Sequence, residues 1–303
     1  MDIKTLRSFI SVAENKSFSA AAKQLHTVQP AISRHIAQLE EALGVSLFNR
    51  NSREVAITSA GKQLLSDGQL ILTQIDTAKT NAQRAEKGEI GTLKVAHMPS
   101  ACLPFMAGLV NQYINRYPAV HVNLYEMTVT QQLEAFKNDR IDIGFSRPMP
   151  ASIQEDFISH DIYNDRLVVV VNEQHPLADR DAVALSELQQ EDFIIFNREE
   201  AVGLFDDTLG LCNDAGFSPN IISQPRHMQT LLTEVASGLG IGIGPYCIRK
   251  QHSAGCHFLT IKQVDKIIPL QLHFKRQSHD ATVRPFVDIA LASRPEIEAS
   301  MAI

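Results

Sequence analysis

The stretch that decides the fold is residues 20–50, AAAKQLHTVQPAISRHIAQLEEALGVSLFNR. It starts with small residues, passes through a short polar turn, HTVQP, and continues as a segment with helical periodicity. Pro30 fits the first turn of this second helix, where its missing N–H costs no hydrogen bond. Gly44 ends the helix, because glycine readily adopts the left-handed conformation of a helix C-terminus. The stretch therefore predicts two short helices joined by a tight turn.

A further helix is expected before this pair, over about residues 3–14, because apolar residues recur there on one face. Ser17 or Ser19 can cap the helix that begins at Ala20. In the helix after Pro30, the apolar residues form a stripe that should be buried: Ala31, Ile32, Ile36, Leu39 and Leu43. The outer side near its start is polar: Gln29, Ser33, Arg34 and His35. This pattern is typical of a helix-turn-helix that reads DNA.

The first 58 residues are the basic part of an acidic chain. Residues 45–58, VSLFNRNSREVAIT, predict two short strands that form a wing carrying Arg50 and Arg53. The 303 residues have a formal net charge of −6, yet residues 1–58 hold seven Lys and Arg against five Asp and Glu. Residues 91–303 hold 17 basic and 25 acidic residues. Such a split indicates a nucleic-acid-binding part attached to an acidic domain.

The composition favours a cytoplasmic protein. The longest apolar run, residues 167–171, is much shorter than the roughly 18 residues that cross a membrane. The N-terminus has no apolar stretch followed by a cleavage site, so no signal peptide is expected. The cysteines form no CxxC pair, which suits thiols in a reducing compartment: Cys102, Cys212, Cys247 and Cys256.

Residues 59–90 predict a linker that contains one long helix and ends in a hinge, KGEIG. Thr58 can cap the helix, and residues 59–88 contain no proline. Small and apolar residues alternate at steps of four and three: Leu64, Gly68, Ile71, Ile75, Ala78, Ala82 and Ala85. Such a heptad seam is typical of helix pairing between two chains. The alternative is an amphipathic helix that packs on its own chain.

Residues 91–303 alternate between apolar runs of strand length and amphipathic helical segments, which predicts parallel α/β sheets. Ligands of such folds bind at the carboxyl ends of strands, near helix N-termini. Ser100 follows the first strand, and Thr128 and Thr130 follow the second. Their hydroxyl groups can hold a carboxylate, or they can be ordinary helix caps.

Residues 17–61, SFSAAAKQLHTVQPAISRHIAQLEEALGVSLFNRNSREVAITSAG, resemble the winged helix-turn-helix of the LysR-type transcriptional regulators. The shared motifs occur in order: Gln-Pro-x-x-Ser-Arg, Leu-Glu-x-x-Leu-Gly, Leu-Phe-x-Arg and Thr-x-x-Gly. The resemblance implies that these residues face the major groove: Gln29, Pro30, Ser33, Arg34 and His35. It implies that Arg50 and Arg53 grip phosphate or the minor groove. Val28 departs from the pattern, which usually has a capping Ser or Thr there, so Thr27 or a shift of the backbone would have to compensate.

The resemblance continues through the whole chain and implies three parts: a DNA-binding domain (1–58), the linker (59–90) and an effector domain (91–303). The effector domain would be of periplasmic-binding-protein type, with one subdomain at 91–163 and 267–303 and another at 164–266. It looks most like the branch that senses aromatic-acid metabolites. By position, the residues that would line its cleft are Ser100, Thr128, Val129, Thr130, Arg147, Gly203, Leu204, Arg226 and His227. Val129 departs from that branch, which commonly has a hydroxyl group there.

The resemblance also implies a homodimer or homotetramer that pairs through the linker helix, and a small carboxylate as effector. Operator DNA and RNA polymerase would be its partners, and no cofactor or metal is expected. An enzyme is disfavoured, because no GxSxG, Walker loop, GxGxxG or HExxH motif occurs. A redox sensor of the same family is the other alternative. Cys212 aligns with its resolving cysteine, but Gly203 stands where its reactive cysteine would be.

Overall fold

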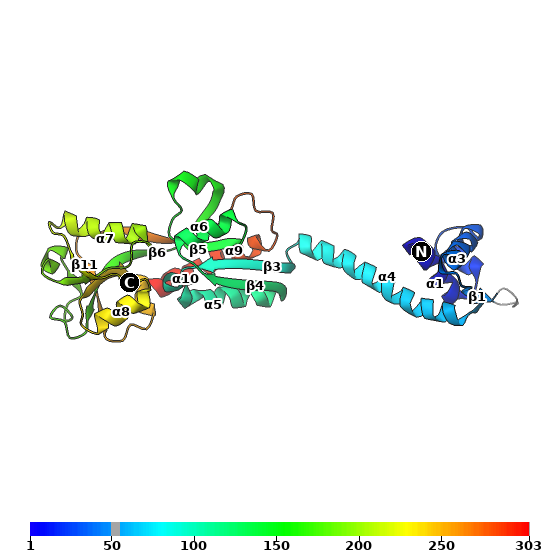
Figure 1. Ribbon diagram of the computed structural model, residues 1–303, viewed down its shortest axis with the longest axis horizontal. Helices are drawn as coiled ribbons and strands as arrows, with labels where there is room; N and C mark the ends of the chain where they lie inside the picture. Colours follow the sequence, from blue (N-terminus) through cyan, green and yellow to red (C-terminus); the bar gives the residue numbers. More distant parts are fainter. Residues whose placement is uncertain (50–54, 303) are drawn as a thin grey trace. The chain divides into compact units, whose positions relative to one another are not determined.

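The computed structural model describes residues 1–49 and 55–302. The chain divides into two compact units, Met1–Arg84 and Ala85–Ile303, which are described separately (Figure 1). We call them unit 1 and unit 2.

Unit 1 begins with three helices, α1 (Ile3–Asn15), α2 (Phe18–Gln24) and α3 (Gln29–Leu43). Asp2 and Thr5 form a capping box at the start of α1, and Ser17 caps α2. Gly44 ends α3 in the left-handed conformation, with φ of 69°. The apolar stripe of α3 is buried at Ile32, Ile36 and Leu39, but the expectation for Leu43 was wrong, since its side chain is 40% exposed. Leu43 is the last residue of α3.

Two short antiparallel strands follow, β1 (Phe48–Asn49) and β2 (Ala56–Ile57). The long helix α4 (Ser59–Glu86) starts after Thr58, whose hydroxyl accepts a hydrogen bond from the N–H of Gly61 at 3.0 Å. Its first turns pack on α1. A Cβ atom at Gly68 would lie 2.9 Å from the Leu6 side chain and 3.2 Å from that of Ile10.

Unit 2 contains strands, helices and three 3₁₀ turns in the order β3 (Ile90–His97), α5 (Pro99–Arg116), β4 (Ala119–Glu126), α6 (Val129–Lys137), β5 (Ile143–Ser146), η1 (Ala151–Asp156), β6 (Phe157–Asn172), β7 (Ala182–Val183), η2 (Leu185–Leu188), β8 (Asp192–Ile194), α7 (Val202–Asp214), β9 (Asn220–Ser223), α8 (Met228–Ala236), β10 (Ile241–Pro245), η3 (Tyr246–Lys250), β11 (Cys256–Ile261), β12 (Ile267–Lys275), α9 (Val283–Ala292) and α10 (Arg294–Met301). The alternation of strands and helices was predicted. The last helix was expected to be residues 282–293, but α10 follows it, because Pro295 is tolerated in the first turn of a new helix.

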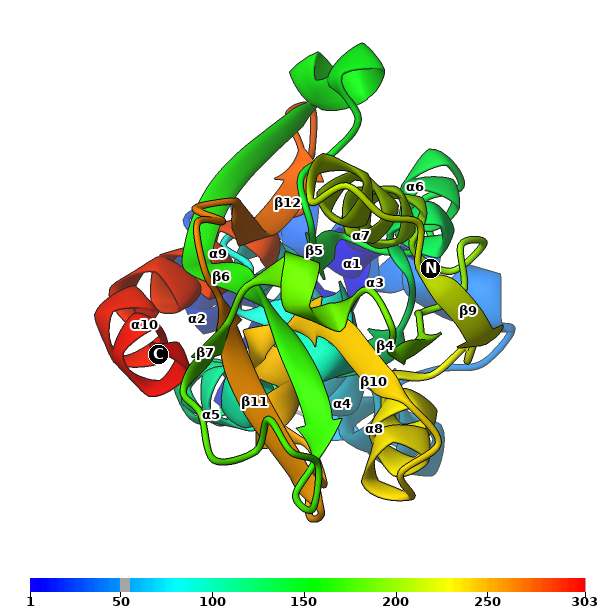
Figure 2. The same ribbon diagram turned by 90° about the vertical axis from the view of Figure 1, so that its left-hand side faces the viewer.

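The strands are ordered β4-β3-β5-β12-β6-β10-β8-β9, and β11 pairs with β6 and β7. β3 is parallel to β4 and β5, whereas β12 is antiparallel to β5 and β6. The predicted parallel pairs are present, but β6 and β12 add antiparallel pairs, so the sheet is mixed. Strand β6 pairs with β12 as far as Arg166 and with β10 from Leu167, so it belongs to both halves of unit 2. Figure 2 shows β6 between β10 and β11.

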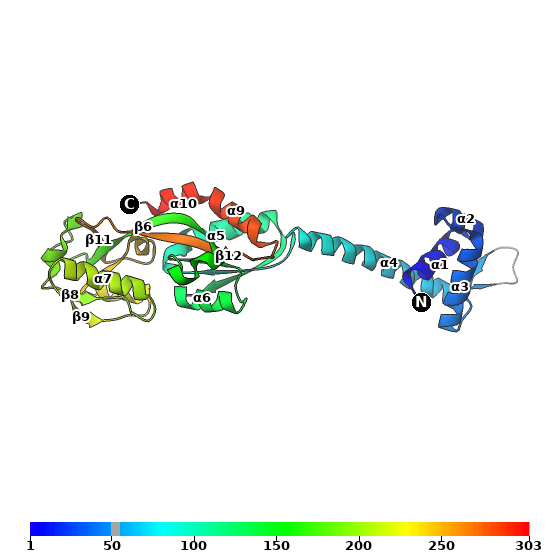
Figure 3. The same ribbon diagram turned by 90° about the horizontal axis from the view of Figure 1, so that it is seen from above.

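Helices cover both faces of the first half of this sheet. One core joins α5 and α9 to the sheet through residues such as Tyr113, Phe145 and Phe286. A second core, with Phe136 and Phe157, packs α6 on the opposite face (Figure 3). Both faces are covered, which explains why β3 and β5 read as apolar runs in the sequence. The carboxyl ends of β3 and β4 are thereby fixed at one edge, next to the N-termini of α5 and α6.

Candidate nucleic-acid interface and ligand site

The first turns of α3 present a polar, exposed surface. The exposed residues are Thr27, Val28, Gln29, Pro30, Ser33 and Arg34. The Ser19 hydroxyl donates to Gln29 Oε1 at 3.1 Å, so the α2 helix orients this side chain. Four of the five residues expected to face the major groove therefore share one accessible surface.

The N-terminus of α3 has no side-chain cap. Val28 occupies the N-cap position in an extended conformation, and Pro30 stands at the second helical position. Thr27 was expected to compensate for the missing hydroxyl group, but no side chain forms a cap bond there. The main-chain N–H of Thr27 instead donates to the carbonyl of Ala22 at 2.9 Å.

His35, the fifth residue, is half-buried. Its Nδ1 atom lies 2.8 Å from the hydroxyl oxygen of Ser8, a buried residue of α1. The imidazole ring therefore helps to fix α3 against α1. Sequence periodicity missed this contact, because a polar partner on another helix leaves no local signal. Arg50 and Arg53, the predicted wing residues, lie outside the described residues.

The predicted seam of α4 divides into two parts. Leu64 is half-buried and packs, with Leu65 and Leu72, against the core of unit 1, so it is less accessible to a partner helix than the later residues of the seam. This part corresponds to the alternative of a helix packed on its own chain. Ile71 is 39% exposed, and Ala78 and Ala82 further along are exposed. Only the seam from Ile71 to Ala85 is thus available to a partner helix.

In unit 2, four helices follow strands of two parallel pairs. α5 and α6 follow β3 and β4, which are parallel neighbours, and α7 and α8 follow β8 and β9, which are also parallel neighbours. The N-termini of α5, α7 and α8 have no side-chain cap. Free main-chain N–H groups and the helix dipole make such N-termini suited to anions.

The residues predicted for a ligand site, other than Arg147 and Arg226, lie at these four N-termini. Ser100 is half-buried in the first turn of α5, whose N-cap is Met98, so Ser100 is not a cap. The hydroxyl of Thr128 accepts from the N–H of Gln131 at 3.4 Å and therefore does cap α6. The remaining predicted residues of this group are in the first turns or at the N-caps of their helices: Val129, Thr130, Gly203, Leu204 and His227.

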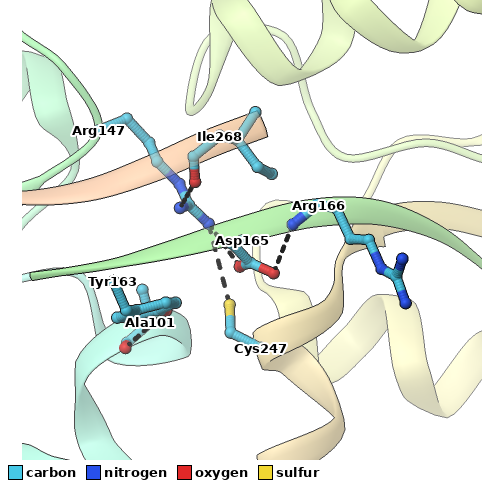
Figure 4. A network of polar contacts seen from close by, with 7 residues as sticks. All are labelled: Ala101, Arg147, Tyr163, Asp165, Arg166, Cys247 and Ile268. Carbon is cyan, nitrogen blue, oxygen red and sulfur yellow. Dashed lines mark hydrogen bonds and ion pairs between the residues drawn. The ribbon is translucent and has the colours of Figure 1, made fainter. Parts of the chain in front are cut away.

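The two predicted cations of the ligand site are already paired. Arg226 is exposed and bonds to Glu199 at 2.9 Å. Arg147 donates from Nη2 to Asp165 Oδ2 at 3.0 Å and from Nη1 to the carbonyl of Ile268 at 2.7 Å (Figure 4). Asp165 on β6 and Ile268 on β12 are direct neighbours in the antiparallel ladder. Arg147 thus clamps the two strands that connect the halves of unit 2, and it does not present a free guanidinium.

Gln132 was not predicted as a site residue. It is fully buried on α6, and its Nε2 donates to the carbonyls of Met127 at 3.1 Å and Phe145 at 3.0 Å. These bonds tie the start of α6 to the end of β5, so Gln132 positions the segment that carries Thr128. No sequence signal distinguishes it from a glutamine on a helix surface.

Two further side chains in unit 2 are held in their neutral form by burial. Burial lowers the pKa of His273 to about 4. The Ser159 hydroxyl lies 2.8 Å from its Nδ1 and the Arg147 carbonyl 3.3 Å from its Nε2. The neutral tautomer with its hydrogen on Nε2 satisfies both partners. Burial also raises the pKa of the Cys247 thiol to about 12.

Burial raises the pKa of the Cys212 thiol as well, to about 11. The thiolate is the reactive form, and a raised pKa keeps both thiols protonated at neutral pH. This observation disfavours the redox alternative.

Comparisons with known proteins agree with this arrangement. The LysR substrate binding domain matches residues 86–294, and the bacterial regulatory helix-turn-helix protein, lysR family, matches residues 3–62. The HTH-type transcriptional regulator ClcR of Pseudomonas putida is 33% identical over 245 residues, which cover 81% of this chain and 83% of ClcR. AlsR of Bacillus subtilis (strain 168), another HTH-type transcriptional regulator, is 28% identical over 303 residues and matches 99% of its own length.

Among solved structures, full-length CbnR complexed with its target DNA superposes with a TM-score of 0.78 at 26% identity. The match covers 97% of this chain and 100% of that one. The chain belongs to the LysR family of bacterial helix-turn-helix transcriptional regulators. The prediction of a regulator rather than an enzyme is confirmed by this membership. Within residues 1–49 and 55–302, no helix is both long and apolar enough to span a membrane.

Proposed function

We propose that this regulator binds operator DNA through α3 of paired chains and is controlled by a small carboxylate bound in unit 2. It works in the cytoplasm as a homodimer or homotetramer and acts on transcription together with RNA polymerase. CbnR, the structural relative bound to its target DNA, supports the assignment of DNA as the partner of unit 1. The observation that carries the proposal is the exposed polar start of α3, because the first residues of a recognition helix contact base edges.

The DNA-binding step uses Gln29, Ser33 and Arg34 to contact bases, with Pro30 and Thr27 beside them. Arg34 is suited to a guanine, whose O6 and N7 atoms accept a bidentate pair of hydrogen bonds from arginine. Arg50 and Arg53 contact phosphate groups, which position the protein without reading sequence. The α3 helices of two paired chains then read two half-sites. Binding two half-sites at once compensates for the small positive charge of each DNA-binding domain.

Pairing uses the free part of the α4 seam, Ile71, Ile75, Ala78 and Ala82. Ile71 and Ile75 supply apolar area, and the alanines allow two helix backbones to approach closely. The linker residues 59–90 thus hold two DNA-binding domains at a fixed spacing.

The effector site lies between the subdomain of residues 91–163 with 267–303 and the subdomain of residues 164–266. The uncapped N-termini of α5, α7 and α8 supply main-chain N–H groups to a carboxylate, and Ser100 supplies a hydroxyl group. The N-terminus of α6, with Val129 and Thr130, completes the wall opposite Gly203, Leu204 and His227. Arg147 and Asp165 contribute by setting the angle between the subdomains, since they join β6 to β12.

One experiment with two arms tests this function. In the first arm, the full-length protein selects duplexes from a random pool, and its affinity for the selected site is compared with that for random duplex. Arg34→Ala should lower the ratio of these affinities at least tenfold, since one bidentate base contact is worth about 1–3 kcal/mol. An unchanged ratio would show that α3 does not read the DNA.

In the second arm, thermal unfolding is measured with small carboxylates and with their primary amides as uncharged controls. A carboxylate that raises the unfolding temperature is then titrated by calorimetry. Ser100→Ala should weaken it roughly ten- to a hundredfold, because a hydrogen bond to a charged group is worth about 1.5–3 kcal/mol. Ser237→Ala, at the C-terminus of α8, is the matched control. An equal loss of carboxylate affinity in both variants, or no loss in Ser100→Ala, would place the carboxylate site elsewhere.

A further inference from the structure

Val28 is an apolar residue at the start of the polar surface of α3. Its side chain is 65% exposed, more than that of any other valine or isoleucine among the described residues. It is absent from the residues that pack against the core of unit 1. Its neighbours Thr27 and Gln29 are exposed and polar. The isopropyl group of Val28 thus lies in water in the free protein.

The Val28 side chain makes no stabilising contact in the free protein. Val28 occupies an N-cap with φ of −105° and ψ of 146°, the conformation in which a serine or threonine would cap the helix. Its carbonyl accepts from the N–H groups of Ala31 and Ile32, at 3.0 and 3.4 Å, so its backbone is already engaged. The side chain neither caps the helix nor fills the core. The Val28 side chain is therefore free to make an apolar contact when α3 binds DNA.

The major groove offers one apolar group to such a side chain. Thymine presents a 5-methyl group there, and apolar side chains contact it, whereas cytosine presents a hydrogen atom at the same position. We propose that Val28 reads the 5-methyl group of one thymine in each half-site of the operator. The proposal rests on the binding of α3 in the major groove, and it adds an apolar specificity contact to the polar ones of Gln29, Ser33 and Arg34.

The test uses the full-length protein and the duplex selected from a random pool. Each thymidine is replaced in turn by deoxyuridine, which lacks only the methyl group. For the wild type, one replacement per half-site should weaken binding about fourfold, the equivalent of about 0.8 kcal/mol for one buried methyl-sized group. For Val28→Ala, the same replacement should leave the affinity unchanged.

Two variants control for folding and position. Val45→Ala removes another exposed valine, beyond the other end of α3, and should keep the full deoxyuridine effect. Val28→Thr keeps one methyl group and the β-branch and adds a capping hydroxyl, so it should fold and show a reduced effect. Thermal unfolding of each variant confirms that the fold is retained.

The outcomes separate this proposal from the function on which it rests. If the protein selects a site but deoxyuridine has no effect at any position, or the same effect in Val28→Ala as in the wild type, the assignment of Val28 is overturned and DNA reading by α3 stands. If no site is selected, both fall.

Discussion

The ion pair of Arg147 and Asp165 is removed from water: the two side chains are 20% and 3% exposed. Taking away one partner of such a pair leaves the other as an uncompensated buried charge. The other carboxylate oxygen of Asp165 accepts a hydrogen bond from the main-chain N–H of Arg166 at 2.9 Å, which does not replace the positive charge of the guanidinium. The arginine thus contributes more to the folded state than a surface cation does.

We expect Arg147→Ala to lower the free energy of unfolding by about 3–5 kcal/mol. Arg198→Ala is the matched control, because Arg198 forms an exposed pair with Asp206 and such pairs contribute about 0–1 kcal/mol. Urea denaturation of both variants measures the difference. Adding Asp165→Asn to Arg147→Ala should recover part of the loss. A loss in Arg147→Ala no larger than in Arg198→Ala would show that the clamp is unimportant for stability.

His273 makes the stability of unit 2 depend on pH. Its pKa is about 4 in the folded protein and about 6.5 when unfolded, so the unfolded chain binds the proton more tightly. The contribution of neutral His273 to the free energy of unfolding is complete above pH 6.5 and is lost as the pH falls through 4. The full loss corresponds to about 3 kcal/mol. Denaturation of the wild type and of His273→Gln at pH 7.5, 5.5 and 4 should show a stability difference that shrinks with falling pH. A difference that stays constant would contradict the assignment.

The packing of α6 on β5 requires a glycine at position 144. A Cβ atom there would lie 2.5 Å from Gln132 Oε1 and 2.9 Å from the ring of Phe136. Both side chains are fully buried, so neither can move away freely. The close approach lets Gln132 reach the carbonyls that it joins.

Gly144→Ala should therefore destabilise the protein by about 1–3 kcal/mol, the usual cost of overpacking. Gly108→Ala tests the opposite case, because Gly108 lies within α5 and a Cβ atom there would meet nothing within 4 Å. It should stabilise by about 0.5–1 kcal/mol, since alanine loses less entropy in a helix. Thermal unfolding of both variants provides the comparison, and equal effects would refute the packing argument.

Elements whose signals are local could be predicted from the sequence. α3 was predicted by its 3.6-residue apolar period, by Pro30 and by Gly44, all of which act within a few residues. The antiparallel direction of β12 could not be predicted, because apolar runs do not record strand direction.

The candidate sites show the same division. The exposed residues of α3 follow from its periodicity, whereas the partners of His35, Gln132 and Arg147 come from other elements. Arg147 contacts Ile268, 121 positions away, and no spacing within the sequence indicates such a contact. The sequence could place residues at helix starts. It could not show whether an arginine such as Arg147 has a free guanidinium or is already paired with a carboxylate.

The free part of the α4 seam is the proposed pairing surface of the assembly. Ile71→Glu combined with Ile75→Glu puts like charges where two linker helices would meet, so the paired chains should separate and affinity for the selected DNA should fall by at least tenfold. Analytical ultracentrifugation and DNA titration measure these two effects. The control pair is Thr77→Glu with Thr80→Glu, on the other side of α4, where both residues are exposed. If both pairs of substitutions left the assembly intact, the seam would not be the pairing surface.

The path of strand β6 also governs the order in which unit 2 is completed during synthesis. The stretch Phe157–Arg166 of β6 pairs only with β12 among the described strands, and β12 begins about a hundred residues later in the chain. As the ribosome releases the chain from its N-terminus, β7 to β11 emerge first and can assemble on the later part of β6. The earlier part waits as an unpaired strand until Ile267–Lys275 appears. A nascent chain arrested before residue 267 therefore carries one finished half and two strands, β5 and the earlier part of β6, that still lack β12 as their partner. Binding by a chaperone or by another nascent chain is expected at these open edges.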